Sequence, residues 1–245
     1  MNYKSKFFLF FIVFLTVFFT LRTINADLYR TAHQDLSGIG WLFSTIGLIF
    51  SILSGFLIQH LWDKWERIQK IVLEEIHSLD HLILFSSSNE TLLSHTKTLV
   101  SNYISHVISN EWTPKAKLLE MKPPILALKE LNVEIIASAS TQQDKVAHTK
   151  LINALLYTRE RRILLSTRQM PYIIKNTFLL STVLVITLSL LVAIQNVALD
   201  LIFTLSIGSL VFAIFLIVDD MDNILSPGAW HVSSKLYKEF LKKLE

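Results

Sequence analysis

Apolar residues along this chain fall into four long runs, two near each end. The runs span residues 7–21, 39–61, 176–199 and 201–218, and none contains a charged side chain except Asp200 between the last two. A helix needs about 20 apolar residues to cross the roughly 30 Å core of a bilayer. Four such runs in 245 residues favour membrane helices over buried helices of a soluble protein. We expect two transmembrane hairpins, at residues 1–62 and 171–220.

In the segment between the hairpins, residues 63–170, apolar residues recur at helical spacing among polar ones, as in an ordinary amphipathic helical domain. The second apolar run is expected to continue as helix to about Phe85, where Ser86 to Asn89 interrupt it and Asn89 caps the next helix. Further helices are expected from Pro123 to about Ala137 and from Gln142 to Arg168. Residues 221–245 form a tail. The predicted fold is an all-α polytopic membrane protein with a helical bundle between its hairpins.

Lysine and arginine residues set the expected orientation. They cluster after the second run, at Lys64, Arg67 and Lys70, and again before the third run, while the loop after Arg22 holds few. The bias toward positive residues on the inner side places both termini and the central domain in the cytoplasm. Alternatively, the first run is a signal peptide that is cleaved near Ala26. Ile24 would then lie three residues before the cleavage site, where isoleucine is a poor residue.

Composition removes several classes of function. The chain has no cysteine, which excludes disulfides, thiolate metal sites and cysteine nucleophiles. It has no phosphate-binding loop, dinucleotide fingerprint or nucleophile elbow, so we expect no enzyme and no cofactor. Polar candidates for a membrane enzyme lie at opposite ends of their helices: Gln59, His60, Lys175, Gln195 and Asn196. The excess of basic residues lies beside the apolar runs, so nucleic acid is not an expected partner.

Three carboxylates, Asp219, Asp220 and Asp222, follow the fourth run. Oxygen ligands at this density suit a hard cation such as Ca²⁺. Negative charge is unfavourable at a helix C-terminus, so the alternatives are a bound cation, ion pairs with Lys or Arg, or a solvated stop signal. Glu74, His77 and His81 share one helical face with Asp80 beside them. This spacing could bind a metal ion, but no further local ligands complete a site, and a polar helix face is the simpler interpretation.

The second apolar run also carries a regular strip, Ser44, Leu48, Ile52 and Phe56, at four-residue spacing, beside small residues such as Gly47 and Gly55. In a symmetric ring of subunits such a strip would form an apolar constriction that gates by dewetting. In a monomer it would be ordinary packing or lipid-facing surface, and the sequence leaves both alternatives open.

Three stretches taken together resemble a known family. They are residues 50–65 (FSILSGFLIQHLWDKW), with Glu74-Glu75 and Glu111-Trp112 following; residues 159–171 (RERRILLSTRQMP); and residues 215–223 (FLIVDDMDN) with 227–234 (PGAWHVSS). Their order and the topology resemble the uncharacterised bestrophin-like bacterial membrane proteins, the family of domain of unknown function 4239. The resemblance covers residue 38 to the C-terminus.

The resemblance implies a channel architecture. Bestrophins are pentameric anion channels whose second membrane helix lines the pore and carries an apolar neck, and some bind Ca²⁺ at an acidic cluster after the fourth helix. On this sequence the neck would fall near Leu48 and Ile52, and the acidic cluster at Asp219, Asp220 and Asp222. In bestrophins an Asn-Pro-Phe-Gly-like turn precedes the acidic run, whereas here the carboxylates come first and Asn223-Ile224-Leu225 replaces Asn-Pro-Phe. The neck also lacks the usual phenylalanines.

The leading hypothesis is therefore a homo-oligomeric ion channel of the bacterial inner membrane, its pore lined by Ser44, Leu48, Ile52 and Phe56, with inorganic ions as permeants. The alternative is a non-conducting membrane protein whose bundle binds a partner or lipid headgroups through Arg159, Arg161, Arg162 and Arg168.

Overall fold

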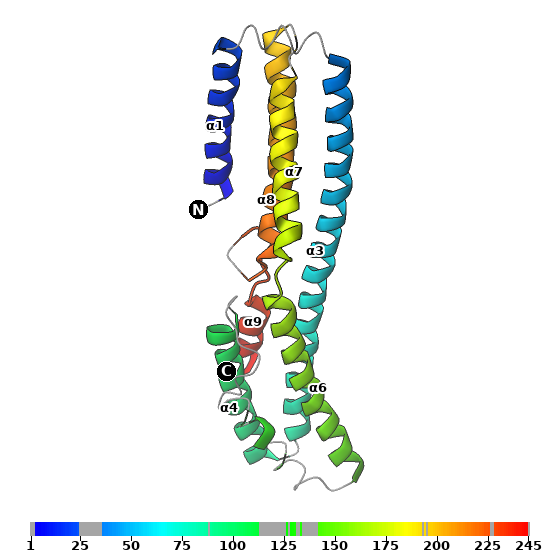
Figure 1. Cartoon of the computed structure of the whole chain (residues 1–245). Coiled ribbons are helices and arrows are strands. Elements are labelled where there is room, and N and C mark those ends of the chain that lie inside the picture. The colour runs from blue at the N-terminus through cyan, green and yellow to red at the C-terminus, as the bar shows by residue number, and fades with distance from the viewer. Residues whose placement is uncertain are drawn as a thin grey trace. The chain divides into compact units, whose positions relative to one another are not determined.

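A computed structural model describes residues 3–24, 36–87, 89–112, 126, 128–130, 133, 142–192, 194, 196–225 and 228–244. Every regular element in these ranges is helical (Figure 1), which confirms the all-α prediction. In chain order the elements are α1 (Tyr3–Ile24), α3 (Leu36–Ser86), α4 (Glu90–His106), η1 (Val107–Glu111), α6 (Gln142–Thr167), α7 (Tyr172–Leu191), α8 (Val197–Asp222) and α9 (Lys235–Leu244). Four helical stretches in the described ranges are long and apolar enough to cross a membrane.

The chain divides into two compact units. The first unit comprises residues 1–62, 170–222 and 228–230, and the second comprises residues 63–169, 223–227 and 231–245. Helix α3 contributes to both, its first half to the first unit and its second half to the second. The helix expected from Pro123 to Ala137 lies mostly outside the described residues.

Helix α3 is one uninterrupted helix of 51 residues. At 1.5 Å per residue it is about 76 Å long, more than twice the length that a bilayer core requires. It contains no proline, and no glycine after Gly55, so nothing in its second half favours a break. It ends at Ser86, and Asn89 begins α4 by accepting hydrogen bonds from the backbone N–H groups of Thr91 and Leu92. The predicted continuation of the second apolar run and the predicted cap are thus confirmed.

Aromatic rings hold the first unit together. Phe178 of α7 stacks on Phe50 of α3 at a centroid distance of 5.7 Å, and Phe10 of α1 stacks on Phe212 of α8 at 4.0 Å. Gly208 of α8 lies under the ring of Phe14, where an added Cβ would come within 2.6 Å of a ring carbon. Glycine at this position therefore lets α1 approach α8 closely.

The boundary between the last two apolar helices differs from the prediction. The third apolar run spans residues 176–199 and the turn to the fourth run was expected at residues 195–200, but α7 ends at Leu191 and α8 begins at Val197. The reason is local: the Asn196 side chain accepts hydrogen bonds from the N–H groups of Ala198 and Leu199 and so caps α8. Hydropathy alone does not register a capping residue inside an apolar run.

A buried ion pair joins α1 to the α7–α8 turn. Arg22 Nε donates to Asp200 Oδ2 at 2.6 Å, and the guanidinium also donates to the carbonyl oxygens of Leu190 and Val192. Asp200 is buried and also accepts from the N–H of Ile194. Helix α1 is thus attached by charge as well as by packing. Asn25 and Ala26, at the alternative cleavage position, lie outside the described residues.

The second unit is built around buried charges. Arg162 of α6, which is 1% exposed, donates from Nε to Glu75 Oε2 on α3 at 2.7 Å and from Nη2 to Glu111 Oε2 on η1 at 2.8 Å. Arg159 donates twice to Glu111 Oε1, at 2.9 and 2.6 Å. The Tyr103 hydroxyl of α4 donates to Glu75 Oε1. We call Glu75, Glu111, Arg159 and Arg162 the buried charge cluster; its two positive and two negative charges balance.

Burial alone would raise the pKa of Glu111, but the charges of Arg162 and Arg159 and their hydrogen bonds outweigh it and lower that pKa below its ordinary value of 4.5. Burial likewise disfavours the charged form of Arg162, yet Glu75 holds the pKa of Arg162 well above its ordinary value. Burial and the nearby Glu75 carboxylate raise the pKa of the Tyr103 hydroxyl. The pairing therefore favours the charged forms of Glu111 and Arg162, whereas the surroundings of Tyr103 favour its neutral hydroxyl.

The tail contains a helix that the sequence interpretation did not predict. Helix α9 buries Tyr237 and Phe240 in the core of the second unit. The Tyr237 ring lies 5.8 Å from the Arg162 guanidinium carbon, and the Trp112 ring lies 5.6 Å from it. Apolar residues at Leu236, Tyr237, Phe240, Leu241 and Leu244 follow a helical period, and this was the available signal.

We expect Arg22→Met to destabilise the first unit strongly, because it leaves Asp200 buried without its partner. Loss of one partner of a buried pair costs about 3–5 kcal/mol. Thermal unfolding in mild detergent should show a large fall in Tm, partly recovered in the double variant Arg22→Met/Asp200→Leu. Lys6→Met is the matched control, because its pair with Asp219 is more exposed, and it should change Tm little. Equal effects of Arg22→Met and Lys6→Met would contradict this assignment.

Acid should weaken the second unit through Glu111. Because its folded-state pKa is lowered from 4.5, the stability it contributes is present above about pH 4.5 and is lost as the pH falls through the folded-state pKa. We therefore expect Glu111→Gln to be much less stable than the wild type at pH 7 and the difference to shrink below pH 4.5. Tryptophan fluorescence during thermal unfolding at each pH measures this. A difference that stays constant from pH 7 to pH 4 would refute it.

Candidate functional site

The strip predicted on the second apolar run lies on the exposed face of α3. Leu48, Ile52 and Phe56 are 62%, 52% and 73% exposed, and Ser44 is exposed as well. We call these four residues the exposed strip. Phe50, Leu57 and Leu61 lie on the opposite face and are buried against α7 and α8. One face of α3 therefore packs within the chain, whereas the exposed strip can meet lipid, water or another chain.

Polar and small residues accompany the exposed strip. Ser51, Gly55 and Gln59 are also exposed on α3, and no atom of another described residue lies within 4 Å of a Cβ built on Gly47 or Gly55. Packing within this chain does not require glycine at either position. In membrane helices, small residues allow close approach of a second helix and polar residues face neighbouring helices or water. The small and polar residues of this face suit contact with another helix or with water, and its exposed apolar residues suit contact with lipid or with another helix.

The acidic cluster at the end of α8 meets lysines and backbone amides. Asp219 lies 3.2 Å from Lys175 Nζ and 3.5 Å from Lys6 Nζ. Asp222, which is buried, accepts from the Met170 N–H at 2.8 Å and lies 3.5 Å from Lys175 Nζ. These contacts offset negative charge at the unfavourable end of the helix. Cation binding here stays a prediction.

Asp220 contacts a different segment, residues 228–230. Its Oδ2 accepts from the Trp230 N–H at 2.9 Å, and a Cβ at Gly228 would overlap its carboxylate. This close approach explains a glycine at residue 228, in the stretch of the sequence that carried part of the family resemblance.

The polar face at Glu74, His77 and His81 lies on α3 within the second unit. His77 and His81 have their Nε2 atoms 3.0 Å apart. Within the described ranges, no group of three or more His, Asp or Glu side chains is arranged to hold a metal ion.

The arginines considered as a headgroup or partner site do not form one surface. Arg159 and Arg162 are buried in the charge cluster, while Arg161 and Arg168 are exposed. The sequence interpretation counted all four as surface charges. The quoted stretches already contained the acidic partners, Glu75 and Glu111, but their sequence separations of 87 and 51 residues from Arg162 hid the pairing.

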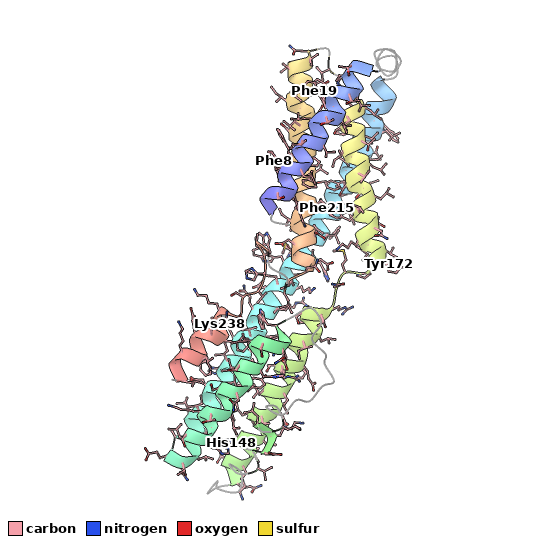
Figure 2. All side chains as sticks on the ribbon, turned by 90° about the vertical axis from the view of Figure 1, so that its left-hand side faces the viewer. Phe8, Phe19, His148, Tyr172, Phe215 and Lys238 are labelled. Carbon is pink, nitrogen blue, oxygen red and sulfur yellow. The ribbon has the colours of Figure 1, made fainter. Side chains whose placement is uncertain are left out.

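Figure 2 shows the side chains of both units. Phe8 and Phe19 of α1 and Tyr172 at the start of α7 are exposed apolar or aromatic side chains. Exposed apolar residues on helices of this length suit contact with lipid acyl chains, and an aromatic ring at a helix end suits the interface with water.

Comparisons with known proteins agree with this architecture. A family model described as the bestrophin-like domain matches residues 8–226. Two point variants of a bacterial bestrophin homologue from Klebsiella pneumoniae are similar to this chain in structure, with TM-scores of 0.69 and 0.68 at 12% identity. The first alignment covers 90% of this chain and 94% of the variant. The second covers 94% of this chain and 96% of the variant. A further structure of this homologue, determined by Zn-SAD phasing, has a TM-score of 0.62 at 12% identity. The alignment covers 90% of this chain and 94% of the other.

None of the curated proteins has significant sequence similarity to this chain. At 12% identity the solved structures establish the fold, and the family model spans nearly all of the 245 residues. With its four apolar helices, this chain belongs to the bestrophin-like family of membrane proteins.

Proposed function

We propose that this protein is a homo-oligomeric ion channel whose pore is lined by α3. The observation that carries the proposal is the exposed strip: Leu48, Ile52 and Phe56 are solvent-exposed in the isolated chain, although the opposite face of the same helix is packed. Membership of the bestrophin-like family supports a channel, because the solved relatives are bacterial bestrophin homologues.

A ring of α3 helices gives the strip a physical role. Successive turns would place Ser44, Leu48, Ile52 and Phe56 around a common axis, with small residues such as Gly47 and Gly55 allowing neighbouring helices to approach. Rings of apolar side chains form a constriction that excludes water and thereby blocks ions. Exposed Ser51 and Gln59 would provide polar contacts beside the constriction.

The proposed setting is the inner membrane of a bacterium, with both termini and the second unit in the cytoplasm. The basic residues near the ends of the apolar helices support this orientation through the positive-inside rule. The proposed partners are lipid and further copies of the chain, in a ring that we expect to be a pentamer. The permeants would be inorganic ions.

Binding of lipid headgroups or a partner through the arginines has less support. Arg159 and Arg162 are fully engaged with Glu75 and Glu111, so two of the four charges in that hypothesis are not accessible. No observation on the remaining pair, Arg161 and Arg168, favours that function over conduction.

We expect Leu48→Ala and Ile52→Ala to raise ion flux severalfold in reconstituted liposomes, because each shortens an apolar side chain at the constriction and makes it easier to hydrate. Leu180→Ala on α7 and Ile202→Ala on α8 are matched controls, since both positions are 59% exposed and lie on helices other than α3. The controls should conduct like the wild type. Unchanged flux in both strip variants, with measurable wild-type flux, would remove these residues from the gate.

The subunit number tests the ring directly. Native mass measurement of the protein in mild detergent or nanodiscs should give a closed assembly of five copies. A monomer or dimer that persists in native-like lipid would leave no ring to surround a pore and would overturn the channel proposal.

A further inference from the structure

Two histidines one turn apart on the second half of α3 form a preassembled pair. The Nε2 atoms of His77 and His81 lie 3.0 Å apart, and their rings are nearly perpendicular, at 80° with centroids 4.4 Å apart. The backbone beneath them is fixed, because Leu79 and Leu82 on the other face of the same turns are fully buried. Both rings therefore direct the same nitrogen to one point from a rigid helix.

The spacing of the two nitrogens is close to that of a metal chelate. With Zn–N bonds of about 2.0–2.1 Å and a tetrahedral angle, two imidazole nitrogens on one zinc ion lie about 3.3 Å apart. The observed 3.0 Å is the distance of a hydrogen bond in which one neutral ring donates and the other accepts. Replacing that single proton with a metal ion requires the rings to separate by only a few tenths of an ångström.

We propose that His77 and His81 bind a divalent transition-metal ion, such as Zn²⁺, Ni²⁺ or Cu²⁺, through their Nε2 atoms. Imidazole ligands select these ions, whereas Ca²⁺ and Mg²⁺ prefer oxygen ligands and should not bind at this pair. Two protein ligands leave the other coordination positions to water. His77 is exposed and His81 is half-buried, so an ion reaches the pair from solvent.

His77 and His81 belong to the second unit, whereas Asp219, Asp220 and Asp222 belong to the first. The proposed metal site needs one chain and no pore. Metal binding and ion conduction can therefore fail independently, and each has its own measurement.

The test uses full-length protein purified without a polyhistidine tag. Isothermal titration calorimetry in detergent, with ZnCl₂ or NiCl₂ alone as the titrant, should show one saturable site per chain. His77→Ala and His81→Ala should each weaken binding by more than about tenfold, because even loss of an outer-shell partner weakens metal affinity by about 10–100-fold. CaCl₂ should give no saturable signal at the pair.

His95→Ala is the control, because His95 is an exposed histidine on α4 and lies outside the pair. It should bind zinc like the wild type. Absence of saturable zinc and nickel binding in the wild type would overturn the proposal. So would zinc affinity that survives in either His77→Ala or His81→Ala, since the proposed chelate needs both rings.

Discussion

The buried Arg162 guanidinium is the constraint on which the second unit depends. A charge removed from water must be fully paired or its burial is strongly unfavourable, and Arg162 is paired on two sides, by Glu75 of α3 and Glu111 of η1. The wide π-helical turn of η1 presents the Glu111 carboxylate to both Arg159 and Arg162. Helices α3, α4 and α6 and the turn η1 thus meet at one electrically neutral centre, and α9 covers it with Tyr237. Apolar packing alone would tolerate sliding of these helices; the paired charges select one register.

Most of the fold could be predicted from the sequence because its signals are local. Apolar runs, the absence of proline in α3 and the cap at Asn89 each act within a few residues, and the predicted helices follow them. The predictions of the fold differed from the structure at the boundary between α7 and α8 and at the helix α9 in the tail. Asn196 caps the first turn of α8 inside an apolar run that hydropathy treats as continuous. Helix α9 is a short amphipathic helix whose Tyr237 and Phe240 need the rest of the second unit to bury them.

The candidate site likewise has features that local sequence predicts and features that only tertiary structure reveals. The exposed strip on α3 follows from helical period alone, although only the structure shows which face packs against α7 and α8. The partners of Arg22, Arg159 and Arg162 could not be predicted, because charges 178, 48 and 87 residues apart pair through tertiary structure. The convergence of His77 and His81 also depends on side-chain torsions, which sequence spacing permits but does not determine.

The pairing of Arg22 with Asp200 has a consequence for biosynthesis. Synthesis proceeds at roughly 5–20 residues per second, so the 178 residues that separate the two side chains take about 10–40 s to make. During that interval α1 and α3 are already available for insertion, while α8 does not yet exist. Arg22 must spend this time near the bilayer without its carboxylate, and its position in the last turn of α1 allows the long side chain to reach toward interfacial water. The first unit therefore closes only after residues 63–169 of the second unit have been translated, so its assembly is a late step in the making of the protein.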